Sequence, residues 1–149
     1  MLRIFVITTL LSLAISTLVI TSPLVTDFPD NTIDYFYANF GEIPYGKTLS
    51  FDLIIFDVSL CGNIENLDHL QKPTYIAIKT NSIDVCSYTK RALNAQLIGA
   101  KGIIIASPKA DYAKGNVIES DDGNGKKVHI SCLHITNDSF EKLRKLSKI

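Results

Sequence analysis

The side chains with the clearest capacity for covalent chemistry in this 149-residue sequence are its three cysteines, Cys61, Cys86 and Cys132. None belongs to a Cys-x-x-Cys pair, and none stands at the Cys/His spacing of a zinc site. Disulfide formation is therefore the chemistry that these residues indicate, provided that the chain folds in an oxidising compartment. In such a compartment we expect two cysteines to pair and one thiol to remain.

Catalytic side chains are not indicated by the remaining residues. Nucleophilic catalysis needs a Ser or Cys held against an oriented base, yet the sequence has no Gly-x-Ser-x-Gly motif and no histidine in a context typical of such a base. Two pairs of neighbouring carboxylates, Glu65 with Asp68 and Asp121 with Asp122, lie in hydrophilic stretches where exposure to solvent explains them. We therefore expect that the protein is not an enzyme.

The sequence also gives little indication of a metal or phosphate site. His69, His129 and His134 are scattered, and the last two are five residues apart on a predicted strand, which places them on opposite faces. In residues 121–125 the carboxylates do not alternate and no Glu closes the segment as in an EF-hand, so a turn is expected. Lys126 lacks the flanking residues of a phosphate-binding loop. We predict no metal and no cofactor.

Residues 1–22 have the pattern of a secretory signal peptide. The amino terminus and Arg3 precede residues 4–20, which carry no charge and are mainly aliphatic with some Ser and Thr. Cleavage is expected near residues 16–22, with Ala14-Ile15-Ser16 as the better site and Val19-Ile20-Thr21 as the second. An uncleaved signal anchor is the alternative, because about seventeen uncharged residues approach the shortest length that spans a bilayer.

Residues 23–149 are expected to form a single domain. Whether or not the leader is cleaved, we expect this domain to enter the secretory pathway and to be secreted or to remain in an endomembrane lumen. A membrane tether is expected only if the leader is uncleaved. Asn137-Asp138-Ser139 is a sequon in a segment that reads as a polar turn, so Asn137 is a candidate glycosylation site. Because 15 basic and 15 acidic side chains balance, we expect no nucleic-acid partner.

Apolar and β-branched stretches predict five strands in this domain. Their residues are 33–38, 53–56, 74–78, 102–107 and 128–135. The continuous apolar character of residues 102–107 predicts a strand that is covered on both faces. A final helix is predicted from a capping-box pattern at Asp138 and Glu141, with Phe140, Leu143 and Leu146 on its buried face.

The clearest helix is predicted over residues 87–98. Tyr88, Ala92, Leu93 and Leu97 are assigned to its buried face, and Lys90, Arg91, Asn94 and Gln96 to its polar face. Gly99 can end the helix by adopting a left-handed conformation. The order strand, helix, strand from residue 74 to residue 107 predicts a crossover that joins parallel strands.

The segment around this helix resembles the signature of the protease-associated (PA) domain family. The residues that carry the resemblance are Cys86-Ser87-Tyr88-Thr89-Lys90, Leu93-Asn94-Ala95-Gln96, Gly99-Ala100-Lys101-Gly102 and Ile103-Ile104-Ile105. Asn39-Phe40-Gly41 with Ile43-Pro44-Tyr45-Gly46 resembles the first strand of PA domains in vacuolar sorting receptors and lumenal-facing RING proteins. The resemblance covers residues 35–146. It implies an α+β fold, a β-sandwich or open barrel flanked by two or more helices.

The resemblance also implies a disulfide between Cys61 and Cys86, which would tie a long loop to the start of the helix. Closing a loop of about 25 residues contributes roughly 3 kcal/mol in the chain-entropy model. Cys132 is then the leftover thiol, and its position between Ile130 and Leu133 favours burial.

The function implied by the resemblance is non-catalytic binding of a protein or peptide. Because loops carry binding while the scaffold stays rigid, the expected surface comprises residues 82–90 and 111–126. Its candidate ligand-binding residues are Asp84, Ser87, Tyr88 and Lys90.

Two features depart from the PA pattern and leave other functions open. Ile83-Asp84-Val85 replaces the Arg-Gly that usually precedes the Cys, so a sorting-receptor role is not predicted, and Ser131 replaces a common Ile-Pro step. One alternative function is that of a structural subunit in a larger lumenal or extracellular assembly, with Cys132 bonded to a partner chain. Another is that of an accessory or truncated relative of a PA-containing protease or receptor.

Overall fold

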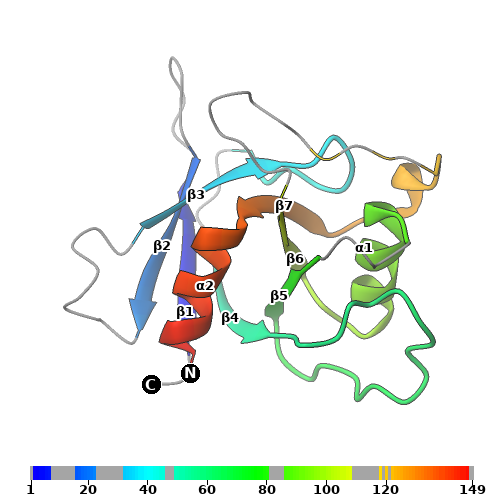
Figure 1. The fold of residues 1–149 in the computed structure, drawn as a ribbon, viewed down its shortest axis with the longest axis horizontal. Coiled ribbons are helices and arrows are strands. Elements are labelled where there is room, and N and C mark those ends of the chain that lie inside the picture. The colour runs from blue at the N-terminus through cyan, green and yellow to red at the C-terminus, as the bar shows by residue number, and fades with distance from the viewer. Residues whose placement is uncertain are drawn as a thin grey trace.

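The structure of the chain is a computed structural model that describes residues 2–7, 16–22, 32–45, 49–80, 86–108, 118, 120 and 122–147. The described residues form seven strands, two α-helices and a short 3-10 helix (Figure 1). In chain order these are β1 (Leu2–Ile7), β2 (Ser16–Ser22), β3 (Thr32–Tyr37), β4 (Leu49–Ile55), β5 (Thr74–Lys79), α1 (Tyr88–Leu97), β6 (Gly102–Ser107), η2 (Gly125–Lys127), β7 (Ser131–Thr136) and α2 (Asn137–Leu146).

The strands curl into a barrel in the order β1-β2-β3-β7-β6-β5-β4. Strands β4, β5, β6 and β7 are parallel to one another, and the predicted crossover through α1 joins β5 to β6. Strands β3 to β4 along this order form a curled half-barrel of five strands, and the antiparallel pair β1–β2 links its two edges. The predicted α+β class with flanking helices is confirmed. The observed sheet is a curled half-barrel that the β1–β2 pair closes, whereas a β-sandwich or open barrel was expected.

The residues predicted as a leader take part in the barrel. Strand β1 pairs with β2 and with β4, and β2 pairs with β3. These pairings belong to a chain that retains residues 1–22, and cleavage near residues 16–22 stays a prediction. In the described part of the chain, neither helix has the length and apolar character that a membrane span requires.

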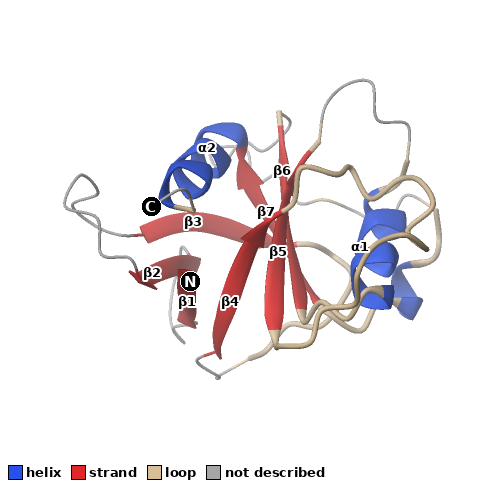
Figure 2. Cartoon of the chain, turned by 90° about the horizontal axis from the view of Figure 1, so that it is seen from below, coloured by secondary structure: helices blue, strands red, loops and turns tan. Residues whose placement is uncertain are grey.

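The central strands are buried on both faces, which explains their continuous apolar sequences. Because side chains alternate along a strand, Tyr75 and Ala77 of β5 face the barrel interior, whereas Ile76 and Ile78 face the other way. The interior cluster also receives Phe140 of α2. The outer cluster receives Ala92, Ala95 and Ile98 from α1. Figure 2 accordingly shows α1 and α2 on opposite sides of the sheet.

Helix α2 begins before its predicted capping box. Thr136, not Asp138, is the N-cap, and its Oγ1 accepts a hydrogen bond from the Ser139 N–H at 3.1 Å. The sequon therefore lies in the first turn of a helix rather than in a polar turn, with Ser139 only 9 % exposed. Phe140, in contrast, is buried as predicted, together with Leu143 and Leu146. Glycosylation at Asn137 stays a prediction.

Gly102 is required at the start of β6 because the Tyr75 ring occupies the space of a side chain. A Cβ at Gly102 would lie 1.6 Å from Cε1 of Tyr75. We expect Gly102→Ala to lower the free energy of unfolding by about 2–3 kcal/mol through overpacking. Gly62→Ala is the matched control, since a Cβ there meets nothing within 4 Å. Urea unfolding of the two variants checks this, and equal stabilities would contradict the packing argument.

Candidate functional site

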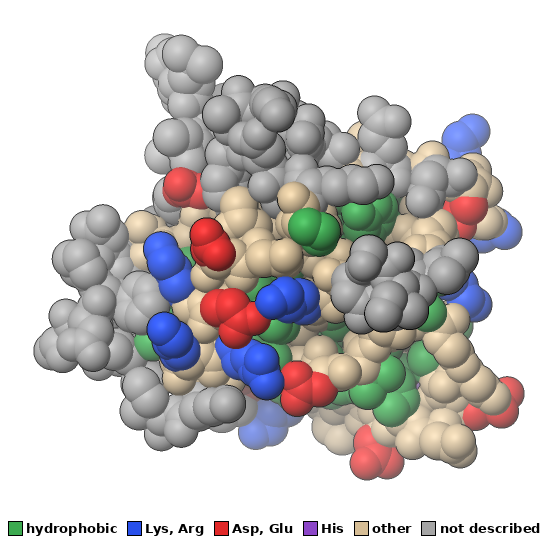
Figure 3. Space-filling view, viewed as in Figure 1, with side chains coloured by type: hydrophobic (Ala, Val, Ile, Leu, Met, Phe, Trp, Pro, Cys, Tyr) green, Lys and Arg blue, Asp and Glu red, His purple; other side chains and the backbone are tan. Residues whose placement is uncertain are grey.

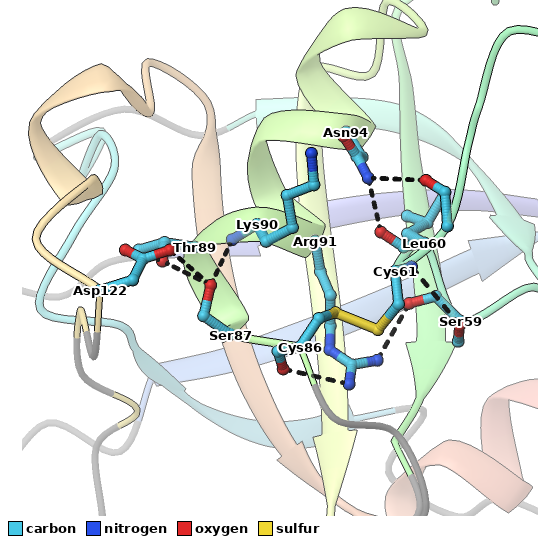
Figure 4. The surroundings of a disulfide bond; sticks show 11 residues. Ser59, Leu60, Cys61, Cys86, Ser87, Thr89, Lys90, Arg91, Asn94 and Asp122 are labelled. Carbon is cyan, nitrogen blue, oxygen red and sulfur yellow. Dashed lines mark hydrogen bonds between the residues drawn. A yellow bond between two sulfur atoms is a disulfide. The ribbon is translucent and has the colours of Figure 1, made fainter.

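The start of α1 is tied by a disulfide to the loop that follows β4. Cys61 and Cys86 are bonded, with their Cα atoms 5.6 Å apart, across 25 residues of sequence (Figure 4). The predicted pairing is confirmed. Cys132 is the leftover thiol, as predicted, and it is only 1 % exposed in the core. Burial raises the pKa of this thiol to about 12.

Two polar residues of α1 hold the same loop by its backbone. The Arg91 guanidinium donates hydrogen bonds to the carbonyl oxygens of Ser59, at 2.9 Å, and Cys86, at 3.4 Å. The Asn94 amide donates to the Leu60 carbonyl at 2.7 Å. Figure 4 shows the guanidinium beside the disulfide, between the two chain segments that the disulfide joins. The loop and the helix are therefore fastened by covalent and polar contacts together.

These contacts correct the predicted faces of the helix. Arg91 and Asn94 were assigned to the solvent, yet each is only 2 % exposed. Leu97 was assigned to the core, yet it is 61 % exposed. The physical reason is that loop carbonyls lie over this part of α1, and a buried carbonyl needs a donor that an aliphatic side chain cannot supply.

At its first turn, α1 is joined to the segment that precedes β7. Ser87 is the N-cap: its Oγ accepts the Lys90 N–H at 2.9 Å and donates to Oδ2 of Asp122 at 2.6 Å. Thr89 donates from Oγ1 to the other carboxylate oxygen. These hydrogen bonds, with one from the Asn124 N–H, hold the pKa of the exposed Asp122 carboxyl well below its usual range. We call this arrangement the Asp122 clamp.

A second contact joins the same two segments further along the helix. The Gln96 side chain donates from Nε2 to the Lys127 carbonyl at 3.2 Å and accepts the His129 N–H at Oε1 at 2.7 Å. An amide that both donates and accepts in this way replaces a pair of backbone hydrogen bonds. Residues 122–129 are therefore fixed to α1 at both ends of the segment.

The predicted binding residues are brought together only in part. Ser87 is engaged in the Asp122 clamp, Tyr88 is half-buried with its ring 6.5 Å from that of His134, and Lys90 is exposed. Of the predicted surface, residues 82–85, which include Asp84, and residues 111–117, 119 and 121 lie outside the described residues. Nothing in the spacing of the sequence identified Asp122, which is 35 residues from Ser87.

A serine–histidine pair is present in the core. Oγ of Ser107 and Nε2 of His134 are 2.8 Å apart, on the neighbouring parallel strands β6 and β7. Both residues are only 1 % exposed, so the hydrogen bond satisfies two buried polar groups. Among the described residues, no group of three or more His, Cys, Asp or Glu side chains is arranged to hold a metal ion.

The face that carries α2 mixes charges of both signs (Figure 3). Nζ of Lys79 lies 2.7 Å from Oε1 of Glu141, and Arg144 lies 3.8 Å from the other oxygen of the same carboxylate. The hydrogen bond from Lys79 holds the pKa of Glu141 below its usual range. Among the described residues of this face, charges of the two signs therefore alternate and no extended surface of one charge forms.

Comparison of the sequence with protein-family models gave no match, and comparison with curated proteins gave no significant similarity.

We expect loss of the disulfide to destabilise the fold. The C61S/C86S variant should lose about 3 kcal/mol of unfolding free energy, because the unfolded chain regains the entropy of a 25-residue loop. Chemical denaturation measures the loss. In a reducing buffer the native chain loses the same link, so the difference between the two proteins should disappear. A difference that persists under reduction would assign the effect to the substitutions themselves.

We expect the Asp122 clamp to be insensitive to mild acid. A carboxyl whose folded pKa is depressed stabilises the fold above its unfolded pKa, about 3.9, and loses that effect as the pH falls further towards the folded pKa. Asp122→Asn should therefore be less stable than the native chain by a constant amount from pH 7 to pH 5. The two should converge below about pH 4. Thermal unfolding across this range checks it, and convergence already near pH 6 would contradict the clamp.

Proposed function

We propose that the chain is a secreted or lumenal, non-catalytic protein of PA-domain type that binds a protein or peptide. The observation that carries this proposal is the Asp122 clamp, which joins the two segments that the sequence nominates for binding. Ser87 belongs to one of these segments and Asp122 to the other. A rigid sheet with two loops fastened at one helix end is an arrangement typical of binding sites.

The disulfide supports the proposed compartment. Bonds of this kind persist in secreted and lumenal proteins and are rare in reducing compartments. Cys61 and Cys86 make such a bond beside the proposed surface. A covalent link to a partner through Cys132 is not favoured, because that thiol is 1 % exposed and β7 would have to leave the core to present it.

Affinity capture from the medium or lumen of cells that express the chain tests this function. We expect one or more protein partners, and a several-fold smaller yield with Lys90→Glu, since Lys90 is exposed whereas Ser87 and Tyr88, the other described residues of the nominated set, are half-buried. Lys101→Glu is the matched control, because Lys101 is also exposed and lies beyond the far end of α1. Equal yields from all three proteins would refute binding at this surface, and peptide hydrolysis abolished by one substitution would refute the non-catalytic role.

A further inference from the structure

A hollow of about 570 Å³ lies beside the Asp122 clamp. Its walls come from the turn after β3 and from the segment around η2, and they include Gly41, Glu42, Gly123, Gly125 and Lys126. This volume is in the range of sites that take small ligands or short stretches of peptide. The hollow uses the segment that the clamp fixes to α1, so the two features share a wall.

The walls are built from backbone held in place. The Glu42 N–H donates to the Ile130 carbonyl at 3.1 Å, and the Asn39 side chain accepts the Ser120 N–H at 2.9 Å. Gly41 has φ +83°, and a Cβ there would lie 2.4 Å from the Ile130 carbonyl oxygen. The backbone at Gly41 therefore lies closer to Ile130, just before β7, than a residue with a side chain could.

The hollow carries one charge of each sign. Glu42 and Lys126 are exposed, and neither side chain has a hydrogen bond or ion pair with another described residue. Lys127, by contrast, is held by Asn124 at 2.9 Å. Glu42 and Lys126 stand on separate walls, one on the β3 turn and one on η2. Within the described part of the chain, both charges are thus unpaired.

We propose that this hollow binds a short extended segment of a partner protein, with a basic group at Glu42 and an acidic group at Lys126. The proposal rests on the peptide-binding function above and names its ligand class. Because the two walls carry opposite charges, the hollow favours a peptide whose basic and acidic residues follow one another in a particular order. It disfavours a peptide whose charged residues are all of one sign. Gly123 and Gly125 also line the hollow, and neither carries a side chain that would occupy it.

A phage-displayed heptapeptide library tests the proposal, with the purified, disulfide-bonded chain as bait. We expect enriched sequences that carry one basic and one acidic residue in a constant order and separation. The E42K/K126E variant, which keeps the net charge, should enrich the reverse order. It should also bind the original peptides about tenfold more weakly in fluorescence polarisation. D68K/K101D, a swap of two exposed charges outside the hollow, should behave as the native chain.

The remaining outcomes separate the two proposals. If the native chain and E42K/K126E enrich the same peptides with equal affinity, the hollow is not the site, although peptide binding stands. If neither protein enriches any sequence, both the hollow and peptide binding are refuted. Enriched peptides of a single charge sign would also overturn the charge order proposed for the hollow.

Discussion

The buried polar contacts of α1 determine where the loop after β4 lies. A helix that buries an Arg and an Asn against a sheet must bring acceptors to them, since unsatisfied buried donors cost about 1–3 kcal/mol each. The acceptors are the backbone carbonyls of Ser59, Leu60 and Cys86. The disulfide then holds the same segments by a covalent bond. The loop after β4 is consequently part of the packed structure around the helix.

The other side of α1 also holds a distant chain segment through polar side chains. The Asp122 clamp fixes the first turn of the helix to residues 122–124, and Gln96 fixes its second half to Lys127 and His129. Each of these contacts uses a polar side chain of the helix to organise a chain segment distant in sequence. Helix α1 therefore positions residues 122–129, and this segment in turn forms one wall of the hollow beside η2.

The sequence was sufficient for the two α-helices and for five of the seven described strands, and insufficient for their polar contacts. Alternation and apolar runs located β3 to β7, and the 3.6-residue period with Gly99 located α1, because these patterns depend on neighbours along the chain. Strands β1 and β2 were not predicted, because an uncharged aliphatic stretch near the amino terminus has the pattern of a leader. The disulfide pairing followed from the PA resemblance. The assignment of Arg91, Asn94 and Leu97 failed, because a helical period assumes that one face meets solvent.

The clamp and the hollow depend on contacts that no local pattern records. Asp122 reads as one acid in a polar stretch until the fold brings it to Ser87. Glu42 and Lys126 are likewise ordinary surface charges until the β3 turn and η2 meet around one space. Long-range placement of exposed polar residues leaves the hydrophobic periodicity unchanged, so periodicity cannot reveal it.

Among the described strands, the β1–β2 pair closes the barrel, so cleavage of the predicted leader would change the sheet itself. A processed chain that began near residue 23 would be topologically open. The free hydrogen-bonding edges of β3 and β4 would then face each other across a gap, and natural sheets protect such edges against pairing with other chains. Cleavage at this position would thus convert a continuous ring of backbone hydrogen bonds into an arc with two ends.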